Sequence, residues 1–96
     1  MVRWTSPATA DLKKTFAYIA EDSKYYARQV VKNIVEKTET LNDFPEIGRT
    51  VPELNEKNIR ELMIYSYRLV YEVKGGDVEI IAIIHGKRDF PKAYGK

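Results

Sequence analysis

The chain has 96 residues, a formal net charge of +2, 44% hydrophobic and 31% charged residues, and no cysteine. This length allows one domain with a single core, and the composition is that of an ordinary soluble protein. The lack of cysteine excludes a disulfide framework, a thiol nucleophile and a zinc–thiolate site, and a single histidine excludes a histidine-rich metal site. No apolar run approaches the roughly 20 residues that cross a bilayer, and the N-terminus lacks a signal-peptide core. We therefore expect a cytoplasmic protein without a membrane, metal or cofactor partner.

The first half of the chain predicts a short strand and two helices. Alternation around Val2 and Trp4 predicts the strand, and Ser6-Pro7 predicts a helix start in which Ser6 is the cap. The pattern breaks at residues 21–23, where Asp22 or Ser23 caps a second helix that Pro45 stops. The apolar positions recur at helical spacing: Ala8, Leu12, Phe16 and Ile19 in the first helix, and Ala27, Val30, Val31, Ile34, Val35, Thr38 and Leu41 in the second. So short a link predicts an antiparallel helical hairpin.

The second half of the chain predicts an irregular segment, residues 45–58, and then three strands. In the middle strand Tyr67, Leu69, Tyr71 and Val73 share one face, which we assign to the core, so Arg68 on the other face is expected to be presented to solvent. A Gly75-Gly76 turn leads to the last strand, residues 78–85. Strict alternation places Val78, Ile80, Ala82 and Ile84 on one of its faces, and Ile81 and Ile83 on the other.

These elements predict an α+β fold, a single two-layer domain over residues 1–96 in the order βααβββ. A helical hairpin packs on a mainly antiparallel sheet. Because the last strand is apolar on both faces, we place the first strand beside it, where the two run parallel.

Three arginines are the first candidate site. Arg60 lies on the strand before Arg68, and Arg88 follows the last strand. Since neighbouring strands lie about 4.8 Å apart, the three side chains are predicted to converge, and convergent guanidinium groups suit a phosphate or carboxylate partner. The alternative is that the two sheet arginines are solvated sheet-face residues paired with nearby carboxylates: Glu61, Glu72 or Glu79.

His85 and the tyrosines are further candidates. His85 suits general acid–base work near neutral pH, although a lone histidine at a strand end is more often an ordinary hydrogen-bonded residue. Four tyrosines cluster with the arginines in the sequence: Tyr65, Tyr67, Tyr71 and Tyr94. Such interleaving suits base stacking, but Tyr71 is in core register, so part of it is packing. Glu46 and Glu53 lie in the irregular segment, and no spacing pairs them with a second acid.

A series of short motifs resembles the RelE/ParE superfamily of toxins from bacterial type II toxin–antitoxin modules. The motifs are Trp4 with Ser6-Pro7-Ala8 and Ala10-Asp11-Leu12, then FPEIGR at residues 44–49 with Pro52-Glu53-Leu54, then YRLVY at residues 67–71 and HGKRD at residues 85–89. The resemblance implies the same βααβββ order, growth inhibition, a role in plasmid stabilisation and a cognate antitoxin as partner. It also allows a heterotetramer or a larger complex with that antitoxin.

Within this superfamily the resemblance divides between two activities. The helical half and residues 44–49 and 85–89 look like ParE-type proteins, which poison DNA gyrase and are not known as nucleases. Residues 67–73 and 86–88, with Tyr94, look like RelE-type proteins, which cut ribosome-bound mRNA. In an RNase the resemblance implies Arg68, Arg88 and Tyr94 as catalytic residues, and His85 is the best available base.

A departure from the RelE pattern favours the ParE-type reading. The paired lysines of RelE are replaced by Arg60-Glu61-Leu62, and Glu61 would place negative charge beside a reaction that develops negative charge. We therefore hypothesise a ParE-like gyrase poison. Its predicted binding residues for an anionic partner surface are Arg60, Tyr67, Arg68, Lys87 and Arg88. A ribosome-dependent mRNA endoribonuclease and a non-toxic antitoxin-binding relic are the alternatives.

Overall fold

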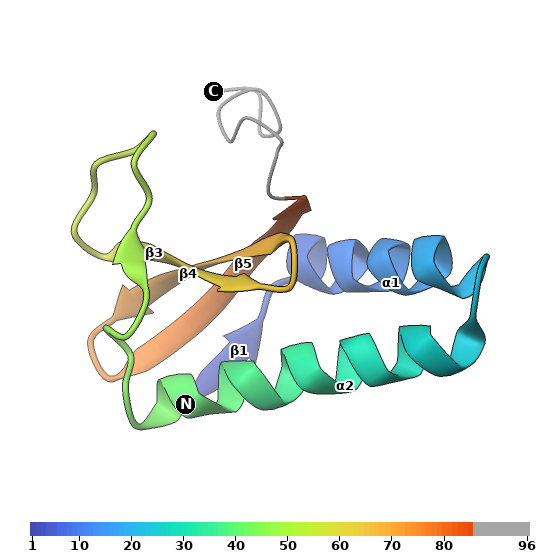
Figure 1. The fold of residues 1–96 in the computed structure, drawn as a ribbon. Coiled ribbons are helices and arrows are strands. Elements are labelled where there is room, and N and C mark those ends of the chain that lie inside the picture. The colour runs from blue at the N-terminus through green and yellow to red at the C-terminus, as the bar shows by residue number, and fades with distance from the viewer. Residues whose placement is uncertain (86–96) are drawn as a thin grey trace.

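The computed structural model describes residues 1–85 and confirms the α+β fold (Figure 1). One layer is the antiparallel hairpin of two helices, and the other is a five-stranded sheet in the order β1-β5-β4-β3-β2. The elements are β1 (Val2–Trp4), α1 (Ser6–Ala20), α2 (Lys24–Glu39), a 3₁₀ turn (Thr40–Asn42), β2 (Arg49–Thr50), β3 (Ile59–Ile64), β4 (Tyr67–Lys74) and β5 (Asp77–His85).

The sheet confirms the predicted pairing of its first and last strands. β1 runs parallel to β5, and the other neighbours are antiparallel. Gly75 has φ +60° in the turn between Lys74 and Asp77, a conformation that glycine adopts without a steric penalty. The prediction of an irregular segment over residues 45–58 missed β2, because two residues are too few to show an alternating pattern.

The helix starts follow from side-chain caps. Thr5, not Ser6, caps α1, so that prediction was wrong by one residue: its Oγ1 accepts a hydrogen bond from the Ala8 amide at 3.3 Å. The same hydroxyl donates to the Ile80 carbonyl at 2.8 Å, which fixes the start of α1 against β5. Ser23 caps α2, as one of the two predicted alternatives.

Apolar clusters cover both faces of the sheet. The larger cluster lies between the sheet and the helices, and its buried members are Ala8, Val30, Ile34, Leu41, Ile64, Leu69, Tyr71, Val78, Ile80 and Ile83. The smaller one lies on the far face, where residues of the 51–58 loop pack over the strands; its members are Val51, Val70, Ala82 and Ile84, with Leu54, Ile59 and Ile81 beside them. The 51–58 loop therefore covers apolar residues on the far face of the sheet, as the helices do on the near face.

A β-bulge in β5 overturns the predicted alternation along that strand. Val70 pairs with Ala82, whereas the next residue of β4, Tyr71, pairs with Ile80, so Ile81 is the extra residue. Beyond the bulge the faces exchange, and Ala82 lies in the far-face cluster while Ile80 lies under the helices. Since β5 is apolar on both faces, its sequence pattern contained no sign of the shift.

Candidate functional site

Arg68 is buried in an ion-pair network on the far face of the sheet, with only 7% of its surface exposed. Its Nε donates to Glu61 at 2.7 Å, and its two terminal nitrogens each donate to one oxygen of Glu53 at 2.8 Å. The hydrogen bonds with Glu53 raise the pKa of Arg68 most strongly; burial opposes this shift and Glu61 adds to it. Each of the three nitrogen atoms of the guanidinium group therefore donates a hydrogen bond to a carboxylate of the same chain.

Glu61 is the other centre of this network. Its side chain is fully buried and also accepts a hydrogen bond from Arg49 Nε at 2.7 Å. The alternating series Arg49, Glu61, Arg68 and Glu53 joins β2, β3 and β4 to the 51–58 loop. The alternative was correct in pairing Arg68 with Glu61 but wrong in making it a solvated residue. The prediction of a solvent-facing Arg68 was wrong because this loop folds over the strand.

Arg60 lies on the opposite face of the sheet from Arg68. It pairs with Tyr71 across the strands, whereas Arg68 pairs with Met63, three residues further along β3. An odd separation along a strand places side chains on opposite faces, so the predicted convergence of Arg60 and Arg68 was wrong. Arg60 instead donates from Nη1 to the Gly48 carbonyl at 2.8 Å and to the Glu46 carbonyl at 3.3 Å.

The remaining predicted site residues divide between a groove and the end of the chain. Lys87, Arg88 and Tyr94 lie outside the described residues. Tyr67 and His85 face each other across β4 and β5, and their rings meet edge to face with centroids 5.7 Å apart and an interplanar angle of 81°.

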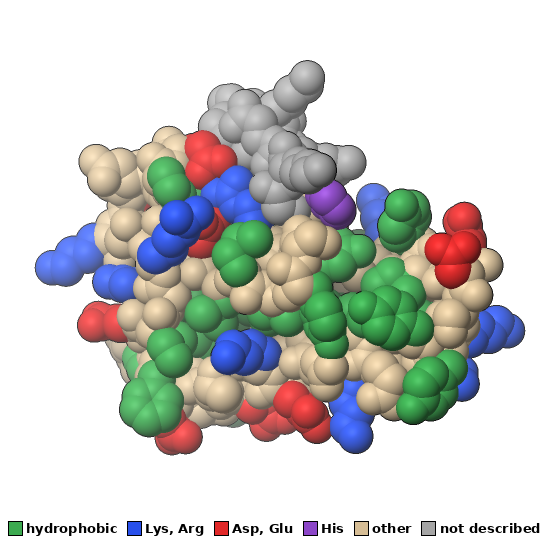
Figure 2. Space-filling model, in the orientation of Figure 1, with side chains coloured by type: hydrophobic (Ala, Val, Ile, Leu, Met, Phe, Trp, Pro, Cys, Tyr) green, Lys and Arg blue, Asp and Glu red, His purple; other side chains and the backbone are tan. Residues whose placement is uncertain are grey.

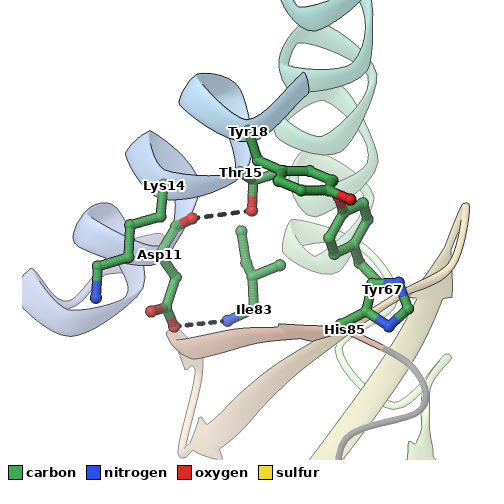
Figure 3. Close-up of a pocket in the computed structure, with 7 residues that line it drawn as sticks. All are labelled: Asp11, Lys14, Thr15, Tyr18, Tyr67, Ile83 and His85. Atoms are coloured by element: carbon green, nitrogen blue, oxygen red, sulfur yellow. Dashed lines mark hydrogen bonds between the residues drawn. The ribbon is translucent and has the colours of Figure 1, made fainter. Parts of the chain in front are cut away.

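These two rings form one wall of an open groove of about 380 Å³ between α1 and the sheet (Figure 3). Its lining consists of Asp11, Lys14, Thr15, Tyr18, Tyr67, Ile83 and His85. Tyr18 points from α1 toward Tyr67, whereas the ammonium group of Lys14 points away from both tyrosines. Three of the seven lining residues are therefore aromatic, and the ammonium group of Lys14 lies away from the two tyrosine rings.

Asp11 fixes α1 along this groove. β1 ends at Trp4, and beyond that point α1 supplies a hydrogen bond to the edge of β5, because Asp11 Oδ2 accepts from the Ile83 amide at 3.0 Å (Figure 3). Asp11, Thr15 and Tyr18 are spaced i, i+4, i+7, so one side of the helix faces β5. That spacing is visible in the sequence, although Asp11, Thr15 and Tyr18 were not among the predicted site residues.

Two tyrosines line the groove, Tyr18 on α1 and Tyr67 on β4. The pKa of Tyr67 is raised first by burial and then by the nearby Tyr18 and Tyr26. Tyr18 is 70% exposed and Tyr26 52% exposed. Hydrophobic side chains accordingly gather over the helices near the single histidine (Figure 2).

The described part of the site suits binding better than covalent chemistry. His85 lies beside phenol groups, and the one carboxylate in the groove, Asp11, is held by the β5 backbone. Over residues 1–85, the structure contains no group of three or more His, Asp or Glu side chains arranged to hold a metal ion. No helix in the same range is both long and apolar enough to cross a bilayer.

The fold and this site define a small α+β domain of the RelE/ParE type. The sequence model of the ParE toxin of the type II toxin–antitoxin system, parDE, matches residues 2–90. Toxin ParE3 from Caulobacter vibrioides is 26% identical over 93 residues, which cover 96% of this chain and 92% of the relative. A solved chain of the chromosomal ParDE TA system from P. aeruginosa is 25% identical with a TM-score of 0.72, over 88% of this chain and 92% of that chain.

This chain therefore belongs to the ParE toxin family and is the toxin component of a type II toxin–antitoxin system. The ParE-like character that the motifs indicated is confirmed at the level of the family.

Proposed function

We propose that this toxin inhibits growth by poisoning DNA gyrase, and that it does so by binding and not by cutting RNA. The observation that carries the proposal is the state of Arg68, the residue that matches a catalytic arginine of RelE-type RNases. A phosphoryl-transfer site needs free, preorganised cations around the phosphate. Arg68 instead has its nitrogens bound to Glu53 and Glu61, and the pair of carboxylates would repel a phosphate.

We further propose a cognate antitoxin as the partner that restrains the toxin. Family membership supports this, since the matching family is that of the parDE system. A heterotetramer or a larger complex with the antitoxin belongs to the same proposal. Because gyrase acts on the bacterial chromosome, the proposed activity takes place in the cytoplasm.

The test compares the two targets with one preparation of the purified full-length toxin. Added to gyrase and plasmid DNA, it should inhibit supercoiling and accumulate cleaved DNA. Added to programmed ribosomes with a codon in the A site, it should leave the mRNA intact when the message is read by primer extension. Toxin that is first mixed with its antitoxin is the control and should lose the gyrase effect.

Induction in cells separates the alternatives independently of purified components. Gyrase poisoning should give filamentation with DNA damage, whereas mRNA cleavage would give an abrupt loss of translation. Unaffected growth would indicate the non-toxic relic. Efficient codon-dependent cleavage of mRNA by the unaltered toxin would refute the proposal.

A further inference from the structure

Four partly exposed tyrosines lie on the helices and at the β3–β4 hairpin, and we name them the tyrosine surface: Tyr18, Tyr26, Tyr65 and Tyr67. Tyr18 and Tyr67 line the groove together, and Tyr18 points toward Tyr67 (Figure 3). Tyr18 and Tyr26 both add to the rise in the pKa of Tyr67, after the effect of burial. Tyr65 lies two residues before Tyr67, and its hydroxyl group contacts the Asn33 amide on α2. Asn33 is seven positions after Tyr26, which is about two turns along the same side of that helix.

The two-residue turn between β3 and β4 explains the backbone at Tyr65 but not the choice of tyrosine, since such turns need a positive φ at their first position and favour glycine or asparagine there. Tyr65 has φ +56° in the turn between β3 and β4, a region that glycine occupies freely and that a bulky side chain rarely adopts. Its ring is about half exposed, so the core gains little from it. Strain of this kind concentrates where a side chain has a task beyond packing.

The charges around the groove limit what can occupy it. The described lining residues carry one cation, Lys14, and one carboxylate, Asp11, which accepts a hydrogen bond from the β5 backbone. Over residues 1–85 the charges of the lining therefore balance, which suits an uncharged partner surface better than a strongly charged one. Tyrosine rings are favoured anchors in protein–protein interfaces because they are rigid, large and amphipathic.

We propose that the tyrosine surface and the adjoining groove form the toxin's docking site for the gyrase protein, and that an uncharged, apolar projection of gyrase enters the groove between Tyr18 and Tyr67. The inference rests on the proposed gyrase target. It assigns target binding to the helix side of the sheet, on the opposite face from Arg68.

The test uses the purified full-length protein with Tyr18→Ala and Tyr26→Ala. The matched control is Tyr25→Ala, since Tyr25 is 69% exposed and adjacent to Tyr26 but points about 100° away around α2. Gyrase affinity and the concentration that half-inhibits supercoiling should each worsen by about tenfold or more in the first two variants, as for interface anchors, and by less than about twofold in the control. Melting temperatures and antitoxin affinities should match those of the unaltered protein.

Three outcomes would overturn the docking site. Variants of Tyr18 and Tyr26 that inhibit gyrase as well as Tyr25→Ala does would exclude these rings from the interface. Loss of antitoxin affinity with gyrase inhibition unchanged would assign the surface to the antitoxin. Loss of oligonucleotide binding without loss of gyrase binding would assign it to nucleic acid. Failure of the unaltered toxin to inhibit gyrase would instead refute the proposed function itself, so the two failures are distinguishable.

Discussion

Arg68 illustrates how much of a single residue's role depends on its partners. A guanidinium group in a strand suggests an exposed cation, yet here its donors are divided between a strand carboxylate, Glu61, and a loop carboxylate, Glu53. Burying charges is costly, and the cost is offset only when each charge is paired and hydrogen-bonded. The role of Arg68 is therefore to neutralise the buried Glu61 and to fix the loop.

We expect Arg68→Ala to lower the free energy of unfolding by about 3–5 kcal/mol, because it leaves Glu61 buried with only Arg49 as a partner. Urea unfolding at neutral pH measures the change.

Tyr71→Ala, a large-to-small core substitution, should cost a similar amount, roughly 3–5 kcal/mol.

Arg3→Ala is the matched control for Arg68→Ala, since Arg3 pairs with Glu79 at the surface. Exposed ion pairs contribute little, so this variant should unfold nearly like the unaltered protein. An Arg68→Ala variant as stable as Arg3→Ala would show that the network contributes nothing to folding.

At the scale of elements, the segment between α2 and β2 passes very close to β3 and β4 at Gly48. Gly48 donates its amide hydrogen to the Tyr71 hydroxyl group at 2.9 Å, while its carbonyl accepts from Arg60. A Cβ atom at Gly48 would lie 2.5 Å from the Glu61 carbonyl oxygen and 2.6 Å from the Tyr71 hydroxyl oxygen. Only glycine allows this approach.

Gly48→Ala should therefore destabilise the protein by about 1–3 kcal/mol, the usual cost of overpacking, because the segment must move away from β3 and Tyr71. Gly76→Ala is the control, since a Cβ atom there would meet nothing within 4 Å. Denaturant unfolding of both variants measures the difference. Equal stabilities would mean that the segment adjusts without cost.

On the scale of the whole molecule, Tyr71 links the near-face core to the segment between α2 and β2, because its hydroxyl group accepts a hydrogen bond from Gly48. Burial raises the pKa of Tyr71, and the Gly48 hydrogen bond and the charge of Arg60 only partly oppose that shift. The folded state therefore favours the neutral phenol more than the unfolded state does. The resulting stability is complete below the ordinary tyrosine pKa of about 10 and decreases as the pH rises through the higher folded value.

Alkaline titration should consequently unfold the protein, with the last phenol ionising together with the loss of structure. Ultraviolet absorbance of phenolate and circular dichroism, recorded on the same samples, test this. In Tyr71→Phe, the phenolate absorbance that appears together with the loss of circular dichroism should be missing. In Tyr25→Phe, where the substituted side chain is exposed, it should remain. Ionisation of every tyrosine before any loss of structure would contradict the assignment.

Local patterns in the sequence were sufficient for the helices, the long strands, the glycine turn and the parallel placement of β1 beside β5. Each of these depends on periodicity or on capping and turn residues close along the chain. The core register of Tyr71 followed in the same way. The family motifs added the toxin class, which no single residue type could establish.

The tertiary structure decided which charged and aromatic residues share a face. The bulge at Ile81, the burial of Arg68 and the separation of Arg60 from it all depend on strand register. Contacts between Arg68 and Glu53, or between Asp11 and Ile83, join residues far apart in the sequence, and no local pattern encodes such pairs. Sequence by itself therefore determined the helices, the longer strands and their order, whereas only the packed chain determined β2 and which side chains are available to a partner.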